Sequence, residues 1–301
     1  MKVVIAGGTG FIGRYLVDRY LQMGKQVYVV TRNPSKVDLG VGVGWNSTEL
    51  NAVINESELL INLAGKSVDC RYTKANKAAI YRSRLETTQL LGEVIKKCGK
   101  PPELWINSST ATIYRDARDR PMDERTGELG TGFSVDVATQ WEKTFFEFNL
   151  PKTRQVALRT AIVLGKTGGA LPEYQRLALR GVGGKHGDGQ QRISFVHIHD
   201  VFEAIQFIRD RHQLEGVFNV SAPTSATNEE FLKQVRKCLD IRVGLPIPKT
   251  VLEVGAFLLG TETELLLKSR WVFPKRLTDL GFQFRYPTSQ EALRALLQET
   301  G

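Results

Sequence analysis

Residues 2–21, KVVIAGGTGFIGRYLVDRYL, contain three patterns in immediate succession. The run from Val3 to Ile5 is apolar and β-branched, which favours a buried strand. A glycine-rich segment follows, from Gly7 to Gly13. Beyond its start, apolar residues recur at the spacing of one helical face, namely Ile12, Leu16, Val17, Tyr20 and Leu21. The stretch therefore predicts a strand, a glycine turn and a helix.

The glycine turn has the composition of a dinucleotide-binding loop. Gly7 allows a sharp bend, Gly10 lets backbone amides approach a pyrophosphate, and Gly13 brings the helix against the strand. The helix N-terminus adds unpaired N–H groups and the positive end of the helix dipole. A purely structural turn is the alternative, but the place between strand and helix favours a dinucleotide. We expect the whole loop to contact it, including Thr9, Phe11 and Ile12.

Length and composition indicate a globular protein of a reducing compartment. The chain has 301 residues, 42% hydrophobic and 24% charged, enough for a sizeable core. Three widely spaced cysteines without a CxxC pair predict neither a disulfide framework nor a metal site. The sequence starts with a predicted core strand, and its apolar run near 251–259 is too short to span a bilayer. We expect a cytoplasmic protein that does not contact membranes.

The formal net charge of +9 permits contact with polyanions. However, the lysines and arginines are scattered among acids, and no basic block or aromatic RNA-binding motif is present. We therefore expect no nucleic-acid partner. The charge fits a solvated surface that attracts an anionic cofactor and a small anionic substrate.

The second predicted strand indicates which dinucleotide would bind. It covers Gln26 to Val30 and is followed by Thr31 and Arg32. A site that prefers NAD places an acid here for the ribose 2′-hydroxyl, and this sequence has none. A threonine hydroxyl and a guanidinium suit a 2′-phosphate instead. We therefore expect NADP(H), with the alternative that Arg32 is only an exposed loop cation.

The turn has GxxGxxG spacing, and TGFIG resembles the extended, sugar-nucleotide-epimerase branch of the short-chain dehydrogenases/reductases. Further similar stretches are NLAG at 62–65, SRLETTQLL at 83–91, STATIY at 109–114 and WEK at 141–143. Together they resemble a narrower group, the atypical extended reductases called epimerase family proteins. Residues 270–286 resemble the small C-terminal domain of that group. The likeness covers almost the whole chain and implies NADP(H) binding.

The resemblance implies further cofactor contacts. Leu63, Ala64 and Gly65 match the stretch that lines the adenosine side of the cofactor. Arg84 matches an asparagine or arginine near the cofactor, although a helical arginine is more often a surface residue. Val163 matches a backbone contact under the nicotinamide, with a plain strand end as the alternative.

The resemblance also implies the reacting residues, with one departure. Thr110 occupies the place of the serine that polarises a substrate hydroxyl or carbonyl. The expected YxxxK pair, a tyrosine acid/base with a lysine one helical turn later, is absent. Alignment on Glu142 puts Ser134 in the tyrosine position and Ala138 in the lysine position. Tyr114 or a water chain could take the proton, and Tyr114 could equally be a packing residue.

Substrate contacts are expected after the main strands. Arg159 ends a predicted strand, and GDGQQRISFVHIHD at 187–200 resembles a passage whose arginine meets a nucleotide diphosphate, which makes Gln191 or Arg192 a candidate. His197 and His199 lack a third ligand at a helical spacing, so we expect no metal.

The predicted fold is a doubly wound α/β protein with a Rossmann-type parallel sheet and a smaller C-terminal α/β substrate domain. We assign 1–165 and 195–222 to the NADP(H)-binding domain, and 166–194 and 223–301 to the substrate domain. Residues 34–58 are expected to form a glycine-rich loop and a short helix from about Ser47. Long helices are expected from Thr73 to Cys98 and from Val251 to Leu267.

Two functions remain open at this point. The first is an NADP(H)-dependent oxidoreductase or nucleotide-sugar epimerase-like enzyme, active as a monomer or a homodimer. The second is a catalytically silent NADP(H)-binding regulator or scaffold, which the missing YxxxK pair favours.

Overall fold

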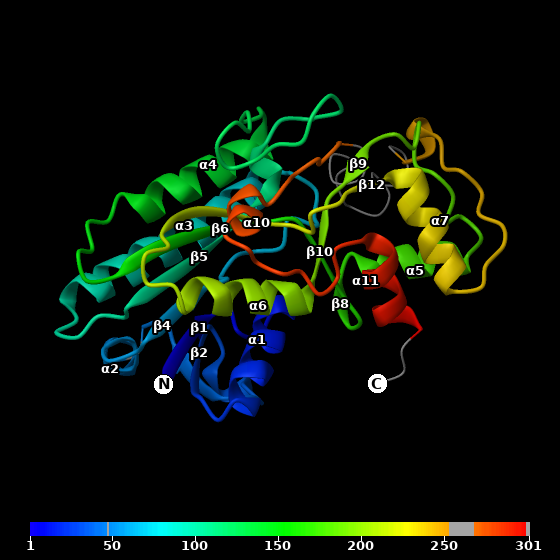
Figure 1. The fold of residues 1–301 in the computed structure, drawn as a ribbon. Helices are drawn as coiled ribbons and strands as arrows, with labels where there is room; N and C mark the ends of the chain where they lie inside the picture. Colours follow the sequence, from blue (N-terminus) through cyan, green and yellow to red (C-terminus); the bar gives the residue numbers. More distant parts are fainter. Residues whose placement is uncertain (47, 253–267, 299–301) are drawn as a thin grey trace.

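The computed structural model describes residues 1–46, 48–252 and 268–298. Its centre is a seven-stranded sheet in the order β11-β6-β5-β4-β1-β2-β3 (Figure 1). All neighbouring strands in this sheet are parallel. The strands are β1 (Lys2–Ala6), β2 (Gln26–Thr31), β3 (Val41–Gly44), β4 (Leu59–Asn62), β5 (Leu104–Thr110), β6 (Arg154–Thr160) and β11 (Gly216–Val220).

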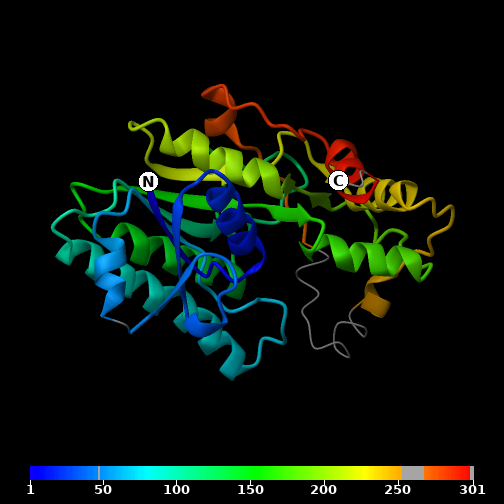
Figure 2. The same cartoon turned by 90° about the horizontal axis from the view of Figure 1, so that it is seen from below.

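Helices cover both faces of this sheet (Figure 2). On one face lie α1 (Phe11–Gln22) and α6 (Ile198–Arg209), whose Tyr20 and Phe202 rings meet edge to face at 5.4 Å. On the other lie α2 (Glu49–Ile54), α3 (Lys74–Lys97) and α4 (Phe133–Phe146). Parallel strands buried on both sides are nearly continuous apolar runs, as in β1 and β4. The predicted doubly wound fold is therefore confirmed.

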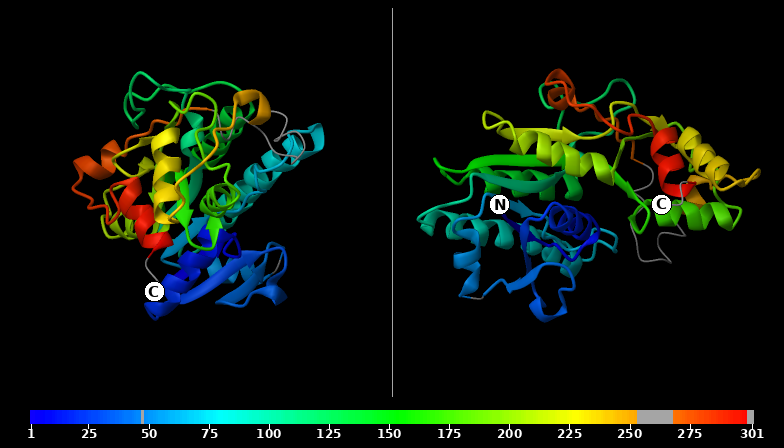
Figure 3. Two further views of the ribbon diagram at one scale, coloured as in Figure 1. Left: turned by 90° about the vertical axis from the view of Figure 1, so that its right-hand side faces the viewer. Right: turned by 60° about the horizontal axis from the view of Figure 1, so that its bottom comes forward.

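A second, smaller lobe stands beside the sheet (Figure 3). It contains a three-stranded sheet of β7 (Ile162–Gly165), β8 (Gly168–Gly169) and β10 (Phe195–His197), and a ribbon of β9 (Arg192–Ile193) with β12 (Ala226–Thr227). Its helices are α5 (Leu171–Leu179), α7 (Asn228–Cys238) and α11 (Ser289–Leu297). Their apolar faces share one buried cluster, centred on Tyr174, Phe231 and Leu293.

The strands β7 and β10 belong to both cores. Val163 and Val196 point into the large core, whereas their neighbours Leu164 and Phe195 point into the core of the small lobe. This is the alternation expected of a strand with two buried faces. The two lobes are thereby joined through packed side chains and not only through loops.

The C-terminal segment departs from the predicted domain division. Helix α10 (Lys275–Asp279) packs on β11, and Leu277 and Phe282 belong to the core of the large sheet. Arg276 donates to the backbone carbonyls of Glu215 and Val217 at 2.9 and 2.6 Å. Residues 275–284 therefore cover the edge of the large sheet, although the sequence assigned them to the substrate domain.

Several predicted elements have the expected ends. Thr73 caps α3 by accepting a hydrogen bond from the Asn76 amide, and Thr227 forms a capping box with Glu230 at α7. The region 34–58 differs, because it contains strand β3 and the short 3-10 helix η1 (Pro34–Lys36) as well as α2. The predicted helix from 251 to 267 lies outside the described residues, apart from its first two positions.

Candidate active site

The strand order of the large sheet reverses between β1 and β4. In open parallel sheets the crevice at such a reversal, outside the carboxyl ends of the strands, is where ligands bind. The glycine turn follows β1 and the stretch 63–65 follows β4, so both predicted cofactor segments meet at this crevice.

The backbone at the crevice requires glycine at two places. Gly7 has a φ of +77°, and a Cβ there would lie 2.9 Å from the backbone carbon and oxygen of Leu63. A Cβ on Gly13 would lie 2.4 Å from the Gly7 carbonyl oxygen. The turn, the helix and the segment after β4 are thus as close as their backbones permit.

The N-terminus of α1 points its amides toward the crevice edge. Its N-cap residue, Gly10, offers no side chain to these amides, and the first turn carries no acid. Thr9 and Gly10 are exposed, so the amides are open to an anion. The Phe11 ring instead packs on Gly165, Gly168 and Gly169, where an added Cβ would lie 2.5 to 2.9 Å from it. Phe11 and the partly buried Ile12 would therefore contact a cofactor through backbone atoms.

The end of β2 presents the residues predicted to read the 2′-phosphate. Thr31 is half-buried and Arg32 is exposed. The Arg32 side chain enters no hydrogen bond or ion pair among residues 1–46, 48–252 and 268–298. The nearby acid Asp38 is already paired with Arg14 through two contacts of 2.8 Å, which hold the pKa of its carboxyl below the ordinary value. The guanidinium of Arg32 is therefore available to an anionic ligand.

A buried polar network supports the segment after β4. The Asn62 amide donates to Asn107 Oδ1 at 2.7 Å and to Thr88 Oγ1 at 3.1 Å, while its oxygen accepts from the Ala64 backbone at 3.1 Å. Trp141 Nε1 also donates to Thr88, at 2.9 Å. The sequence predicts no individual role for Asn62 and Thr88, which lie in the stretches NLAG and SRLETTQLL, or for Asn107, because their partners lie on three different elements. Their effect is to fix the turn that carries Leu63, Ala64 and Gly65.

Arg84 lies beside this turn. Its guanidinium donates to the carbonyls of Lys66 at 3.0 Å and Ile80 at 3.2 Å, and lies 5.1 Å from the Trp141 ring centroid. A Cβ on Gly65 would lie 3.1 Å from its Cζ atom. Burial lowers the pKa of Arg84 to about 10, and the side chain stays charged at neutral pH. Arg84 is thus an ordered cation at the rim of the crevice and not a solvated surface residue.

Thr110 ends β5, next to the same crevice. Its Oγ1 accepts a hydrogen bond from the Thr112 amide at 3.1 Å, which orients the hydroxyl while it can still donate to a ligand oxygen. The side chain is half-buried. Its position fits the predicted role of polarising a substrate oxygen.

Tyr114 and Arg159 belong to a buried network instead of an open surface. Tyr114 is 1% exposed, donates to Asn219 Oδ1 at 2.9 Å and accepts from Arg159 at 2.9 Å. Arg159 also forms two contacts of 2.8 and 2.7 Å with Glu142. Burial raises the pKa of Tyr114. This geometry favours packing roles, so proton transfer by Tyr114 and substrate binding by Arg159 stay predictions that it does not support.

The remaining predicted contacts, Gln191, Arg192 and Val163, also differ in whether the side chain is buried or can reach a ligand. Gln191 is 2% exposed and donates to the His186 carbonyl at 3.1 Å, which makes it a support of its loop. Arg192 is half-buried, and its guanidinium lies 4.5 Å from the Trp271 ring centroid. Val163 is buried in β7, 8% exposed. Arg192 is therefore the one of these three residues whose side chain is exposed enough to contact an anionic ligand.

Helix α4 carries the two positions of the missing YxxxK pair. Ala138 is fully buried, in a cluster with Ala111 and Ile113. Ser134 Oγ lies 3.3 Å from the hydroxyl of Tyr72. No motif of the sequence singles out Tyr72, since it lies in the segment between β4 and α3.

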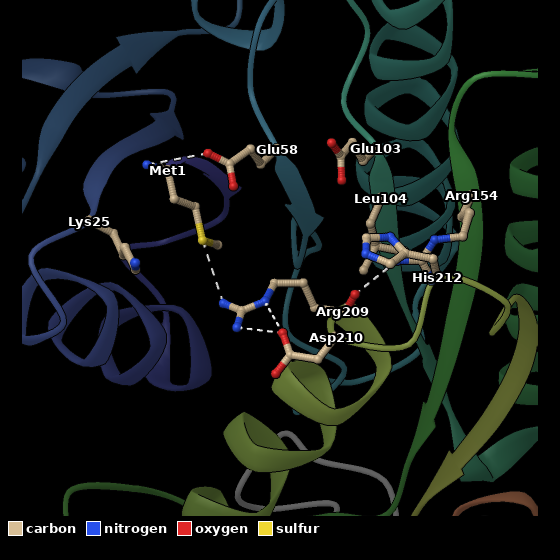
Figure 4. Close-up of a pocket in the computed structure, with 9 residues that line it drawn as sticks. All are labelled: Met1, Lys25, Glu58, Glu103, Leu104, Arg154, Arg209, Asp210 and His212. Atoms are coloured by element: carbon tan, nitrogen blue, oxygen red, sulfur yellow. Dashed lines mark hydrogen bonds and ion pairs between the residues drawn. The ribbon is translucent and has the colours of Figure 1, made fainter.

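A cavity of about 270 Å³ lies far from this crevice (Figure 4). Its lining includes Met1, Glu58, Leu104 and Arg154, which lie at or next to the amino ends of β1, β4, β5 and β6. Arg154 there donates to the Leu214 carbonyl at 2.7 Å and to three other carbonyls at the end of α6. The cavity therefore lies at the amino ends of the strands, whereas the predicted ligand site lies at their carboxyl ends.

Neither a metal site nor a membrane span is found within 1–46, 48–252 and 268–298. No three His, Cys, Asp or Glu side chains of these residues are grouped to hold an ion. None of their helices combines the length and the apolar character needed to cross a bilayer.

Comparison with known proteins relates this chain to one group. The model of the NAD dependent epimerase/dehydratase family matches residues 3–136, and that of a domain of unknown function (DUF1731) matches 247–296. The epimerase family protein SDR39U1 of Homo sapiens is 31% identical, with 99% of this chain and 100% of the relative covered. The crystal structure of human epimerase family protein SDR39U1 (isoform2) with NADPH has a TM-score of 0.87 and covers 99% of both chains.

A nucleoside-diphosphate sugar epimerase from Corynebacterium glutamicum is similar at 25% identity with a TM-score of 0.77, over 98% of this chain and 57% of that one. The motifs and the C-terminal domain thus have the relatives that the sequence resemblance implied. The full-length match to the human protein shows that this chain belongs to the epimerase family proteins.

Proposed function

We propose that the protein is an NADP(H)-dependent oxidoreductase or epimerase-like enzyme acting on a small anionic molecule, of which a nucleotide sugar is the first class to test. The observation that carries this proposal is the arrangement at the carboxyl ends of β1, β2 and β4, which carry the glycine-only backbone, the open helix amides and the exposed Arg32. The NADPH in the structure of the human relative supports the choice of cofactor.

Each cofactor residue has a part in this proposal. The amides of the turn from Gly7 to Gly13 would hold the pyrophosphate, and Thr31 with Arg32 would hold the 2′-phosphate. The segment 63–65 and Arg84 would line the adenosine and ribose, and Val163 would support the nicotinamide through its backbone. When bound, NADP(H) would supply or accept the hydride.

On the substrate side, Thr110 would donate a hydrogen bond to the reacting oxygen. Such a bond stabilises negative charge that develops on a carbonyl oxygen during hydride addition. Arg192 would attract the anionic part of the substrate, since its guanidinium is anchored on the Trp271 ring but only half-buried. A cytoplasmic location suits the three cysteines, all of which are unbridged.

The alternative is an NADP(H)-binding regulator without chemistry. Ala138 favours it, because the fully buried alanine leaves α4 without the expected lysine. A regulator must bind a partner with different affinity in the NADP⁺ and NADPH states, because only differential binding shifts an equilibrium.

The test is a substrate screen that follows nicotinamide absorbance. NADPH or NADP⁺ is mixed with the protein and a panel of nucleotide sugars, sugars and small carbonyl compounds. The enzyme proposal predicts a substrate-dependent change that Thr110→Ala lowers by about 100-fold and Thr110→Ser largely restores. Tight NADP(H) binding without any change across the panel, together with a partner that distinguishes NADP⁺ from NADPH, would favour the regulator.

A further inference from the structure

The missing YxxxK pair leaves a defined gap in the site. Ala138, in the lysine position, is 0% exposed and packs with Ala111 and Ile113. This position therefore supplies no positive charge to the site. Ser134, in the tyrosine position, lies one helical turn earlier on the same face of α4. An aliphatic hydroxyl does not ionise near neutral pH and cannot by itself act as the acid/base.

A phenol from another element lies next to Ser134. The Tyr72 hydroxyl is 3.3 Å from Ser134 Oγ, and its ring meets the Phe133 ring edge to face at 4.7 Å. Tyr72 lies in the segment that leads from the crevice at Gly65 to the start of α3. The backbone is fixed on either side of it, because the Arg71 carbonyl accepts from the Thr73 amide and from the Asn76 side chain, each at 2.8 Å.

A cation accompanies this phenol. Arg84 is one of the ordered charges of the crevice. It donates to the carbonyl of Lys66, in the segment that also carries Tyr72, and burial lowers the pKa of this guanidinium while Tyr72 raises it. A second cation, Lys77, lies 5.1 Å from the Phe133 ring centroid. On α4 the acid Asp136 accepts a hydrogen bond from Tyr81. The Arg84 guanidinium is therefore placed to favour the ionised form of Tyr72, as the lysine of YxxxK does for its tyrosine.

We propose that the hydroxyl of Tyr72, assisted by Arg84, replaces the absent tyrosine as the group that exchanges a proton with the substrate oxygen. This rests on the proposed function. In the reducing direction the substrate carbon receives hydride from NADPH, its C=O becomes C–O–H with the Tyr72 proton, and the resulting phenolate regains a proton from water through Ser134. The oxidising direction reverses each transfer.

Tyr81 provides a matched control. Its ring packs on the same Phe133, at 5.6 Å, but its hydroxyl donates to Asp136. A carboxylate acceptor opposes ionisation of the phenol, whereas a neighbouring guanidinium favours it. Tyr72→Phe and Tyr81→Phe each remove one hydroxyl and keep the ring, so both variants retain the aromatic packing.

The test is the ionisation of Tyr72, followed by nuclear magnetic resonance of protein labelled at tyrosine Cζ. The Tyr72 signal is the one of eight that disappears in Tyr72→Phe. We expect it to titrate about one pH unit or more below the ordinary value near 10 when NADP⁺ is bound, and to move back up by about one unit in Arg84→Gln. The Tyr81 signal should show neither shift.

The proposal would be overturned if the Tyr72 signal titrates at or above pH 10 with and without NADP⁺, and if Arg84→Gln leaves its titration midpoint unchanged. Calorimetry on the same samples separates this result from failure of the proposed function. If NADP⁺ does not bind, the cofactor assignment fails, yet the response of Tyr72 to Arg84→Gln in the cofactor-free protein still decides the phenol–cation pair. With a substrate from the screen, Tyr72→Phe should lower kcat by about 100-fold and Tyr81→Phe should not.

Discussion

The two sides of the crevice are built from different parts of the chain. The cofactor side, comprising Gly7–Gly13, Thr31–Arg32 and 63–65, is shaped mainly by backbone atoms, and two added methyl groups would collide with it. The proposed substrate side, comprising Thr110, the α4 positions Ser134 and Ala138, and Arg192, is shaped by side-chain pairs. Backbone contacts tolerate only glycine, whereas side chains can be replaced from another element. The residues of the cofactor side are thus more constrained than those of the proposed substrate side.

The largest expected effect concerns the buried Arg159–Glu142 pair, which lies beside the strand end that carries Thr110. Arg159→Met leaves Glu142 buried without its guanidinium, because both side chains are only 12% and 10% exposed. Removing one partner of a buried pair should lower the free energy of unfolding by about 3–5 kcal/mol. Urea unfolding measures this loss, and the double variant with Glu142→Gln should lose less than the sum of the singles. A loss below about 1 kcal/mol would show that the pair has no structural role.

A smaller effect is expected on the cofactor side. Gly13→Ala forces a Cβ to within 2.4 Å of the Gly7 carbonyl oxygen and must displace the turn. NADPH affinity should fall roughly 100-fold, about 2.7 kcal/mol, in a titration followed by calorimetry. Gly99→Ala is the control, because a Cβ there meets nothing within 4 Å. Equal affinity of Gly13→Ala and wild type would mean that the turn does not hold the cofactor.

The third prediction concerns His186, which lies in the loop between α5 and β9. It is 0% exposed, neither ring nitrogen has a hydrogen-bond partner among the residues that the structure describes, and burial lowers its pKa to about 4. The unfolded chain binds a proton below about pH 6.5 and the folded one does not, so stability falls as the pH drops toward 4. His186 alone should therefore lower the free energy of unfolding by about 2 kcal/mol when the pH falls from 7 to 5.

Unfolding by urea at pH 7 and pH 5 checks this value. His186→Leu should remove the part of the pH dependence of stability that comes from His186. The part that comes from His197 should persist, because burial also lowers the pKa of His197 to about 4. The exposed His212 supplies a control in His212→Gln. An unchanged pH dependence in His186→Leu would place the acid sensitivity elsewhere.

The sequence could predict features made by residues close together in the chain, but not those made by residues that only the fold brings together. The glycine turn, the Thr73 cap and the capping box at Thr227 are local, so their residues lie within a few positions of one another. Strand β3 was missed because its residues VGVG look like a loop until they pair with β2. Tyr72 and Ser134 are 62 positions apart, and only the tertiary fold brings them together.

The remaining measurement addresses the central claim, that the cofactor side is intact and selects NADP(H). Wild type, Arg32→Ala and the control Arg242→Ala, which removes another exposed arginine, are each titrated calorimetrically with NADPH and NADH. We predict that wild type prefers NADPH and that Arg32→Ala weakens NADPH roughly 10-fold to 100-fold, about 1.4–2.7 kcal/mol, while NADH is unaffected. Arg242→Ala should match wild type. Equal binding of NADPH and NADH by wild type, or binding of neither, would contradict the account.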